Sequence, residues 1–319
     1  MLILLCLIGL LPSFLQRPLR NMLGANLAAG SSISIFSIIL VRKLKMERGS
    51  RIGMGSFIKA DHCELGQNAK IRGLSFFKVR RLDLADNVIV DPLVLVNCDF
   101  GPRSQLRMGK HSRIFSFSVL EPSEGIFVGE QAGLGGQCLI FCHGSWPNYL
   151  DGAPYSRGPV HIGDQVWLPW RVMILPNTKI GAKAVIGAHS LVRGEVPSHS
   201  LFSGVPAKLI LAEAWKNLGA SEKNARLQEV ITSFHQFHNE KYRNKLDIQA
   251  YTSANESGAG SSEKILYSFQ ALGAAELKSA LHDRQVLIDF QGLQVAGQGP
   301  IATLFIEHLA TYGVRLTQV

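Results

Sequence analysis

Apolar residues recur at every sixth position through the middle of the chain. From residue 162 to residue 192 this series is aliphatic throughout, and small or β-branched residues stand four positions behind it. The first series is Ile162, Leu168, Ile174, Ile180, Ile186 and Val192, and the second is Val166, Val172, Thr178, Ala184 and Ser190. Neither an α-helix nor an ordinary strand has this period. The pattern predicts a parallel β-helix, in which each six-residue unit forms one flat side of a prism.

Glycine follows the inward aliphatic residue in several units. We expect Gly163, Gly181 and Gly187 to lie at corners between two sides, where a residue without a Cβ supplies backbone freedom.

The same phase continues upstream with lower fidelity. Inward and small residues pair at Leu27/Ser31, Ile33/Ser37, Ile52/Ser56, Leu65/Ala69, Leu84/Val88, Met108/Ser112 and Val128/Ala132. Three stretches break the phase, Ser75–Arg81, Asp99–Gln105 and Glu121–Gly125, and we expect them to be enlarged corners. The largest break is the insertion His143–Pro159, which is rich in aromatic and turn residues. Loops this long inside a compact repeat are usually functional or disordered.

A long stretch of the repeat resembles a known enzyme family. The run VHIGDQVWLPWRVMILPNTKIGAKAVIGAHSLVRGEVPSHSLFSGVPAKLI is similar to the C-terminal half of hexapeptide-repeat acetyltransferases, which O-acetylate sugars, serine and antibiotics. The resemblance is specific over residues 128–210, diffuse over 20–127 and absent after 245. It implies a left-handed parallel β-helix, since periodicity alone does not reveal the hand. Pro169 and Val205 depart from the Gly and Asn that are usual in the family.

The resemblance also implies a catalytic base. Moving an acetyl group from a thioester to a hydroxyl needs a group that accepts the hydroxyl proton, and imidazole, with an unperturbed pKa of about 6.5, suits that task. His143 ends a coil immediately before the insertion, which is the place of the catalytic histidine in the family. The alternative is a structural histidine that bonds to a carbonyl at the corner. Cys142 is a weaker candidate for a covalent acyl carrier, because adjacent residues of a strand face opposite ways.

Binding residues follow from the same resemblance. In the family the pantetheine arm of acetyl-CoA lies outside the prism between neighbouring subunits, so a homotrimer is implied. The cofactor-binding candidates are Trp167, Gly187, Ala188 and Ser190, with Lys183, Arg193 and Lys208 as cations for the phosphates. The candidates for binding a sugar acceptor are Trp146, Asp151, Tyr155 and Arg157 in the insertion, although the role of Arg157 is also open to a structural reading. No metal is expected.

Charge is concentrated at the N-terminus. The chain carries 33 Lys and Arg against 24 Asp and Glu, a net charge of +9. The basic residues up to position 59 are Arg17, Arg20, Arg42, Lys43, Lys45, Arg48, Arg51 and Lys59, opposed only by Glu47. They follow the apolar stretch MLILLCLIGLL, which is too short to span a bilayer as a helix and lacks the features of a secretory signal. We expect a membrane anchor at the cytoplasmic face, and the alternative is a helix buried against the prism or in the trimer. No aromatic platform supports a nucleic-acid partner.

The cysteines indicate the compartment. Five cysteines without a C-x-x-C pair indicate a reducing compartment.

The C-terminal part of the chain has the patterns of helices and strands. We expect an amphipathic helix over 221–243, a strand over 285–290, a helix over 301–312 and a strand over 314–319. The predicted segments are 1–26, apolar and basic; 27–212, the β-helix; 213–249, a helical extension; 250–263, a Gly/Ser-rich flexible linker; and 264–319, a small α/β module of unknown role.

These observations predict an acetyl-CoA-dependent O-acetyltransferase that acts on a sugar hydroxyl, in the biosynthesis of cell-surface polysaccharide or glycolipid. One alternative is a β-helix scaffold without catalytic activity. The other is a γ-type carbonic anhydrase, which needs three histidines around zinc. No two histidines of the chain have the H-x-x-x-x-H spacing that would supply two of these ligands.

Overall fold

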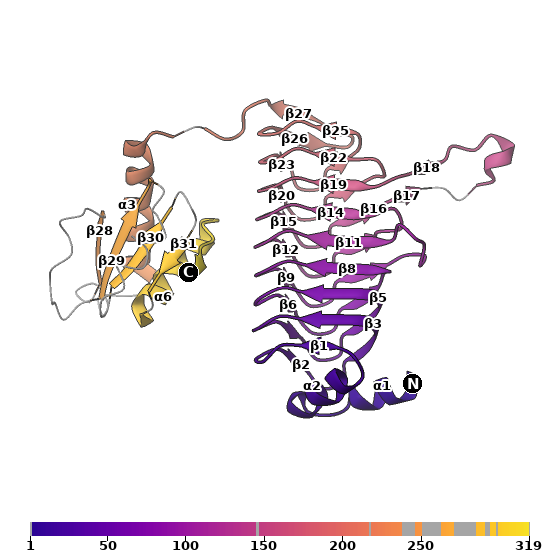
Figure 1. Ribbon diagram of the computed structural model, residues 1–319. Coiled ribbons are helices and arrows are strands. Elements are labelled where there is room, and N and C mark those ends of the chain that lie inside the picture. The colour runs from indigo at the N-terminus through magenta and orange to yellow at the C-terminus, as the bar shows by residue number, and fades with distance from the viewer. Residues whose placement is uncertain are drawn as a thin grey trace. The chain divides into compact units, whose positions relative to one another are not determined.

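The computed structural model describes two separate compact units. The described residues are 2–144, 147–216, 218–237, 246–250, 263–270, 285–290, 294–297 and 299–318. The units comprise Met1–Lys216 and Asn217–Val319. In Figure 1 the first unit is a stack of strands with two helices at its N-terminal end, and the second combines helices with a sheet.

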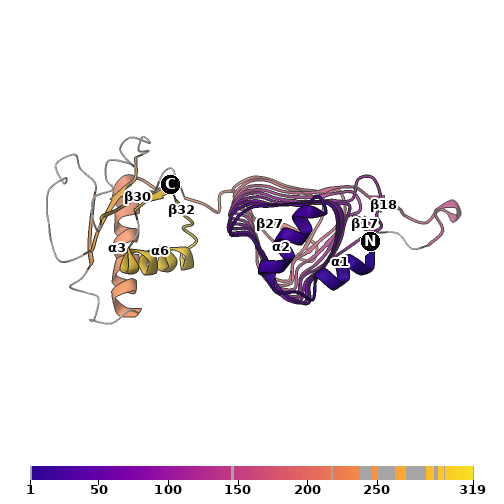
Figure 2. The same cartoon turned by 60° about the horizontal axis from the view of Figure 1, so that its bottom comes forward.

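The first unit is a prism with a triangular cross-section, seen along its axis in Figure 2. One face is a ten-stranded sheet, parallel apart from its last pair. Its order is β2 (Ser32–Ile33), β4 (Arg51–Ile52), β6 (Lys70–Ile71), β9 (Ile89–Val90), β12 (Arg113–Ile114), β15 (Gly133–Leu134), β20 (Trp167–Leu168), β23 (Val185–Ile186), β26 (Leu201–Gly204) and β27 (Ala207–Leu211).

The other two faces belong to one sheet of fifteen strands. One arm holds β7 (Phe76–Lys78), β10 (Leu95–Asn97), β13 (Val119–Glu121), β16 (Leu139–Phe141), β21 (Met173–Ile174) and β24 (Leu191–Val192). The other holds β1 (Asn26–Leu27), β8 (Arg81–Leu84), β11 (Gln105–Met108), β14 (Ile126–Val128), β19 (Val160–Ile162), β22 (Lys179–Ile180) and β25 (Glu195–Val196). The long strands β3 (Ile38–Met46) and β5 (Phe57–Leu65) join the arms, because β5 pairs with both β7 and β8.

The predicted inward residues form the core. Every member of both series between positions 162 and 192 is buried, and so are the predicted upstream pairs. Small polar residues at the second position also form hydrogen bonds, and in several coils the hydroxyl donates to the carbonyl three residues earlier. Ser112 Oγ, for example, lies 2.7 Å from Gly109 O, and Thr178 Oγ1 lies 2.7 Å from Leu175 O. The left-handed parallel β-helix with an N-terminal helix, a C-terminal helix and an α/β appendage is therefore confirmed as the fold class.

The glycines at the corners have a different role from the expected one. The left-handed conformation falls two positions later, at Gln165 and Lys183. Gly163 is required by close approach instead, since a Cβ there would lie 2.7 Å from the backbone nitrogen of Ala182 in the next coil. Gly181 would meet Ser198 in the same way. The expectation of backbone freedom was wrong for these positions, because neighbouring coils leave no room for a side chain.

The lower fidelity upstream has a physical cause. Ile33, Ile52 and Ile71 are in register on one face at intervals of nineteen residues, one more than three hexapeptides hold. The extra residue lies in the long strands β3 and β5, which connect successive strands of the ten-stranded sheet. It shifts the six-residue phase by one position in each of these coils. Of the three expected enlarged corners, the stretch 75–81 was interpreted wrongly, because it contains strand β7.

Two short helices precede the first coil. Helix α1 (Leu2–Ile8) contacts β3, and α2 (Ser13–Met22) contacts β1 and β2. The expected single apolar helix is thus a pair that covers the N-terminal end of the prism (Figure 2). Among the described helices, none combines the length and the apolar character that crossing a membrane requires.

The second unit is a five-stranded sheet packed with helices. Its order is β28 (Leu246–Ala250), β29 (Glu263–Ser268), β30 (Gln285–Asp289), β31 (Gln294–Ala296) and β32 (Thr317–Gln318). Helix α6 (Pro300–Thr311) confirms the expected helix there, and α3 (Ala220–Phe237) confirms the beginning of the helix expected from residue 221.

The predicted boundaries of this unit were wrong. The apolar side of α3 packs into the core of the second unit, because Leu227 and Phe234 cluster with Ile265 and Phe305. Residues 246–250, placed in a helical extension, form a strand paired with β29. The interior of the expected linker, residues 251–262, lies outside the described residues.

Candidate active site

His143 lies in close contact with a buried carboxylate from the preceding coil. Its Nδ1 atom lies 2.7 Å from Glu121 Oε2. The same oxygen accepts from the hydroxyl of Ser123 and from the backbone N–H of Cys142, each at 3.2 Å. An ionised carboxylate only accepts hydrogen bonds, so the imidazole proton belongs on Nδ1. The lone pair of a neutral His143 is then on Nε2, on a side chain about half exposed to solvent.

The coil geometry explains this pairing. Strands β13 and β16 are parallel neighbours, with Glu121 opposite Phe141. The chain leaves β16 through Cys142, which is buried, and His143, which is exposed. Alternation along the strand therefore directs the thiol inward and the imidazole outward, as the sequence predicted. Burial raises the pKa of the Cys142 thiol to about 12, so this cysteine is a poor nucleophile.

The insertion forms an arm that begins at His143. Strands β17 (His143–Gly144) and β18 (Ser156–Arg157) pair antiparallel, with His143 opposite Arg157, and project from the prism (Figure 1). Beyond them the short 3-10 helix η1 (Tyr149–Asp151) is capped by Asn148, whose side chain also donates to Asp151 at 2.8 Å. Tyr155 stacks edge-on against the ring of Tyr149, with centroids 5.7 Å apart. Trp146, a predicted acceptor contact, lies outside the described residues.

A second carboxylate anchors the arm. Glu124 is buried and pairs with the guanidinium groups of Arg157 and Arg103. Burial by itself raises the pKa of Glu124, but the hydrogen bonds from the two arginines outweigh it and hold that pKa below its usual value. Arg157 is thus committed to a structural pair, and its pKa is raised by hydrogen bonds to Tyr155 and Glu124 despite some desolvation.

The predicted cofactor residues lie on several edges of the prism. Gly187 and Ala188 occupy the corner that follows β23, and the side chain of Trp167 in β20 is partly exposed on the ten-stranded face. Ser190 is buried and its hydroxyl accepts from the N–H of Gly204 at 3.0 Å. Its side chain therefore points into the prism.

The predicted cations are not gathered into one patch. Lys183 has left-handed backbone geometry at a different corner from Ala188, and its ammonium lies 5.9 Å from the ring centroid of Trp215. Arg193 is exposed beside Gly194, between β24 and β25, and Lys208 is exposed on β27.

One corner of the prism is apolar along most of its length, and we call it the apolar corner. Successive coils place exposed side chains there: Ile35, Phe36, Met54, Leu74, Leu93, Phe117 and Trp170. Backbone bonds stack these turns, for example from Phe117 N to Leu93 O at 3.2 Å and from His189 N to Trp170 O at 3.1 Å. Ala188, next to His189, therefore continues the apolar corner. His143 instead follows β16 of the other sheet, so one chain does not bring His143 and this corner together.

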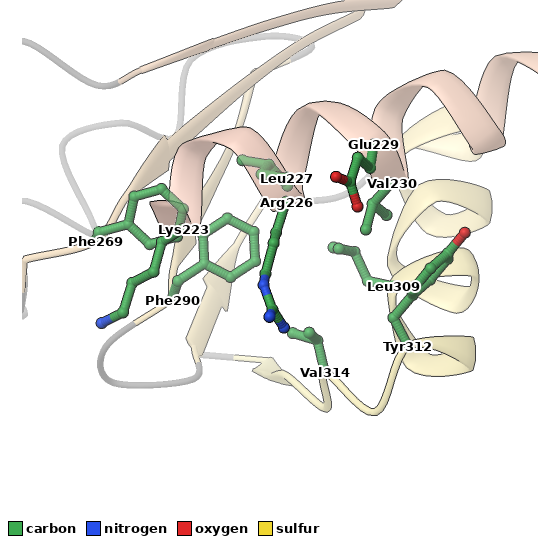
Figure 3. A pocket seen from close by; sticks show the side chains of 10 residues that line it. All are labelled: Lys223, Arg226, Leu227, Glu229, Val230, Phe269, Phe290, Leu309, Tyr312 and Val314. Carbon is green, nitrogen blue, oxygen red and sulfur yellow. The ribbon is translucent and has the colours of Figure 1, made fainter. Parts of the chain in front are cut away.

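Two other features were not predicted from the sequence. His62, Glu64 and Asp83 could place ligand atoms within 4.8 Å of one another, although Lys45 and Arg81 already pair with the two carboxylates. In the second unit a cavity of about 350 Å³ lies between α3, α6 and the sheet (Figure 3). It is lined by Lys223, Arg226, Leu227, Glu229, Val230, Phe269, Phe290, Leu309, Tyr312 and Val314. No role is assigned to either feature.

Sequence reasoning missed the carboxylates around His143. Glu121 and Glu124 were placed in an enlarged corner without a chemical role. The available signal was their position one coil before the histidine, since residues one coil apart lie side by side in a β-helix.

Parts of the chain are similar to known acetyltransferases. No protein-family model matches the chain. A stretch of 101 residues, 31% of this chain and 27% of the relative, is 43% identical to serine acetyltransferase 4 of Arabidopsis thaliana. A stretch of 51 residues, 16% of this chain and 26% of the relative, is 51% identical to WbbJ of Escherichia coli K12, whose name assigns it O-acetyl transfer in lipopolysaccharide biosynthesis.

A solved hexapeptide-repeat acetyltransferase of Vibrio cholerae, complexed with acetyl-CoA, is 25% identical with a TM-score of 0.33 over 39% of this chain and 69% of that chain. The chain spans about a quarter of the length of the two curated relatives. The resemblance of the repeat region to hexapeptide-repeat acetyltransferases is confirmed by the sequence relatives.

Proposed function

We propose that the protein is an O-acetyltransferase that moves the acetyl group of acetyl-CoA to the hydroxyl of a sugar. The observation that carries the proposal is the close contact of 2.7 Å between His143 Nδ1 and Glu121 Oε2 on an exposed edge, in which Nδ1–H donates to the carboxylate. It leaves Nε2 of the imidazole as a base that faces solvent, at the foot of an arm with aromatic and acidic side chains. The names of the sequence relatives support acetyl transfer.

The chemistry is direct transfer within a ternary complex. Nε2 of His143 takes the hydroxyl proton as the hydroxyl oxygen attacks the thioester carbonyl. The tetrahedral intermediate then collapses, the carbon–sulfur bond breaks, and the imidazolium returns the proton to the thiolate of coenzyme A. Glu121 acts as a positioning residue, because it fixes the imidazole orientation and stabilises the imidazolium that forms.

The complete site requires a homotrimer in this proposal. His143 and the corner that carries Gly187 and Ala188 occupy different parts of one chain. A neighbouring subunit packed along the apolar corner would cover its exposed side chains, which otherwise face water. It would also bring the predicted cofactor residues Trp167 and Ala188 toward another subunit's His143. Within this cleft Trp146, Asp151 and Tyr155 would contact the acceptor.

The acceptor class follows from the arm and from one relative. Aromatic faces and carboxylates are the groups that commonly bind sugars, and WbbJ is named for lipopolysaccharide biosynthesis. We therefore assign the protein to the biosynthesis of surface polysaccharide or glycolipid, at the cytoplasmic face of the inner membrane.

The test is transfer of radiolabelled acetyl from acetyl-CoA by the purified full chain. Nucleotide sugars and lipid-linked glycans serve as acceptors, with free serine as the comparison. We expect labelled sugar ester with at least one glycan and none with serine. A protein that binds no acetyl-CoA in calorimetry and labels no acceptor would instead be a scaffold, and preferential labelling of serine would refute the sugar assignment.

A further inference from the structure

Helix α2 turns its polar side toward the prism. Gln16 and Arg20 are both buried, although amphipathic helices usually bury their apolar side. The amide of Gln16 donates to Ser34 O of the first coil at 3.4 Å, as well as to Leu11 O between the two helices at 2.7 Å, and the guanidinium of Arg20 donates to Ile39 O at 3.4 Å. The polar side chains of this helix therefore serve backbone groups at the end of the β-helix.

The end of a β-helix explains this inversion. Strands of the first coil have no preceding coil, so their backbone groups on that side need other partners. Asn21 supplies both partners for Leu27, since its Oδ1 accepts from the Leu27 N–H at 2.9 Å and its Nδ2 donates to the Leu27 carbonyl at 3.2 Å. Burial lowers the pKa of Arg20 to about 10, which still leaves the guanidinium charged at neutral pH.

The consequence is an apolar surface that faces outward. We call it the cap face, and its exposed members are Leu4, Leu7, Leu10, Phe14, Leu15, Leu19, Met22 and Leu23. Met22 is 83% exposed and Phe14 73%. Leucines of both helices, with Ile8 and Met22, line one open groove of about 460 Å³. A contiguous exposed surface of this kind marks an interaction site.

Exposed cations lie in the same part of the chain. Arg17 is exposed on α2, and Lys43, Arg48 and Arg51 are exposed in the first two coils. Glu47 is the single acid up to position 59 of the sequence. Figure 2 shows α1 and α2 across the end of the prism, so the cap face and these coils share that end.

We propose that the cap face docks onto an anionic phospholipid bilayer. Its leucines, Phe14 and Met22 enter the boundary of the acyl chains, while Arg17, Lys43 and Arg48 lie near lipid phosphates. A second copy of the chain is a poorer occupant, because its own cap face would bring the same cations into opposition. The inference deepens the proposed membrane location, and it does not depend on acetyl transfer.

The test is co-sedimentation of the purified full chain with sucrose-loaded vesicles, without acetyl-CoA or acceptor. We expect binding to vesicles of phosphatidylglycerol and phosphatidylethanolamine, and little binding to pure phosphatidylcholine. The variant Leu7→Ser/Phe14→Ser/Met22→Ser should reduce the vesicle partition coefficient by about tenfold or more. The matched control is Leu150→Ser, since Leu150 is an apolar residue 90% exposed on the arm, and it should bind as the parent does.

Charge is tested separately. Lys43→Gln/Arg48→Gln should lower binding to the anionic vesicles by about 30-fold, given roughly 1 kcal/mol for each of the two basic residues near such a surface. Lys208→Gln/Lys216→Gln should leave that binding unchanged. Circular dichroism of each variant verifies folding.

Two binding results would overturn the proposal: a parent protein that does not bind anionic vesicles, or a triple variant that binds them as well as the parent does. So would concentration-dependent pairing of trimers in lipid-free sedimentation that the triple variant abolishes, which would identify a second copy as the occupant. None of these outcomes bears on acetyl transfer.

Discussion

Glu121 holds His143 from one coil earlier, with Oε2 of the carboxylate 2.7 Å from Nδ1 of the imidazole. The carboxylate is itself fixed by Ser123 and by the backbone of Cys142. Its other oxygen, Oε1, is buried and has no hydrogen-bond partner among the described residues. The position of the imidazole is therefore set by the prism, and in the proposed function the arm supplies the surroundings of the acceptor.

Removing this positioning contact should slow catalysis without weakening donor binding. Glu121→Gln keeps the shape but loses the charge that orients and stabilises the imidazolium, and we expect kcat to fall about 100-fold with little change in the KM for acetyl-CoA. The matched control is Glu195→Gln, an exposed acid near the end of the prism. Equal rates for parent and Glu121→Gln would show that the pair has no role in the reaction.

Cys142 should be dispensable. Its thiol is buried, donates to Gly125 O at 3.3 Å, and has a pKa raised to about 12 by burial. We expect Cys142→Ser to retain activity within about threefold, and iodoacetamide at pH 8 to modify the more accessible Cys6 first. Peptide mass mapping provides the order of modification. Rapid labelling of Cys142 with matching loss of activity would revive the covalent alternative.

Acidification should release the arm only at low pH. The pKa of Glu124 is below its usual value, so the stability from its pairs with Arg103 and Arg157 is fully present above the unfolded pKa of about 4.3 and is lost as the pH falls through the lower folded value. Hydrogen exchange at Gly158, whose N–H donates to Cys142 O, reports the attachment. We expect slow exchange at pH 5 and acceleration below about pH 4.

A charge-removing variant separates this effect from general acid unfolding. Glu124→Gln should accelerate exchange at Gly158 already at pH 7, whereas Asp151→Asn, at the exposed tip of the arm, should not. If both variants retain the exchange rate of the parent, the arginine pairs do not anchor the arm.

The close approach of coils predicts a contrast between two glycines. A Cβ at position 181 would collide with Ser198, while one at position 101 would have no heavy atom within 4 Å. Gly181→Ala should therefore cost about 1–3 kcal/mol of unfolding free energy. Gly101→Ala should change it by no more than about 0.5 kcal/mol. Thermal or urea unfolding measures both, and similar values for the two variants would contradict the packing argument.

Local repetition made most of the prism predictable. Burial of Ile174 and Thr178 depends only on their places within a six-residue unit, so the sequence contains the information directly. Glu121 and His143 lie one coil apart, which brings them near each other, but the six-residue period is broken between them and so does not give the exact pair. The burial of the polar side of α2 could not be predicted from the sequence either, for another reason. Gln16 is buried because the first coil lacks a preceding coil and Ser34 O accepts from its amide, whereas amphipathic helices usually bury their apolar side.

The boundary of the second unit required tertiary information as well. An apolar stripe predicts that α3 packs on something, but it does not say on which neighbour. Contacts with Ile265 and Phe305 assign the helix to the C-terminal unit.

The central claim is that His143 is the base for acetyl transfer, and His143→Ala tests it most directly. Initial rates with the best acceptor and calorimetric titration with acetyl-CoA are measured on the same preparation. We predict that transfer falls roughly 10²–10⁴-fold while the Kd for acetyl-CoA stays within about twofold of the parent. A variant that transfers acetyl within about threefold of the parent rate would contradict the account.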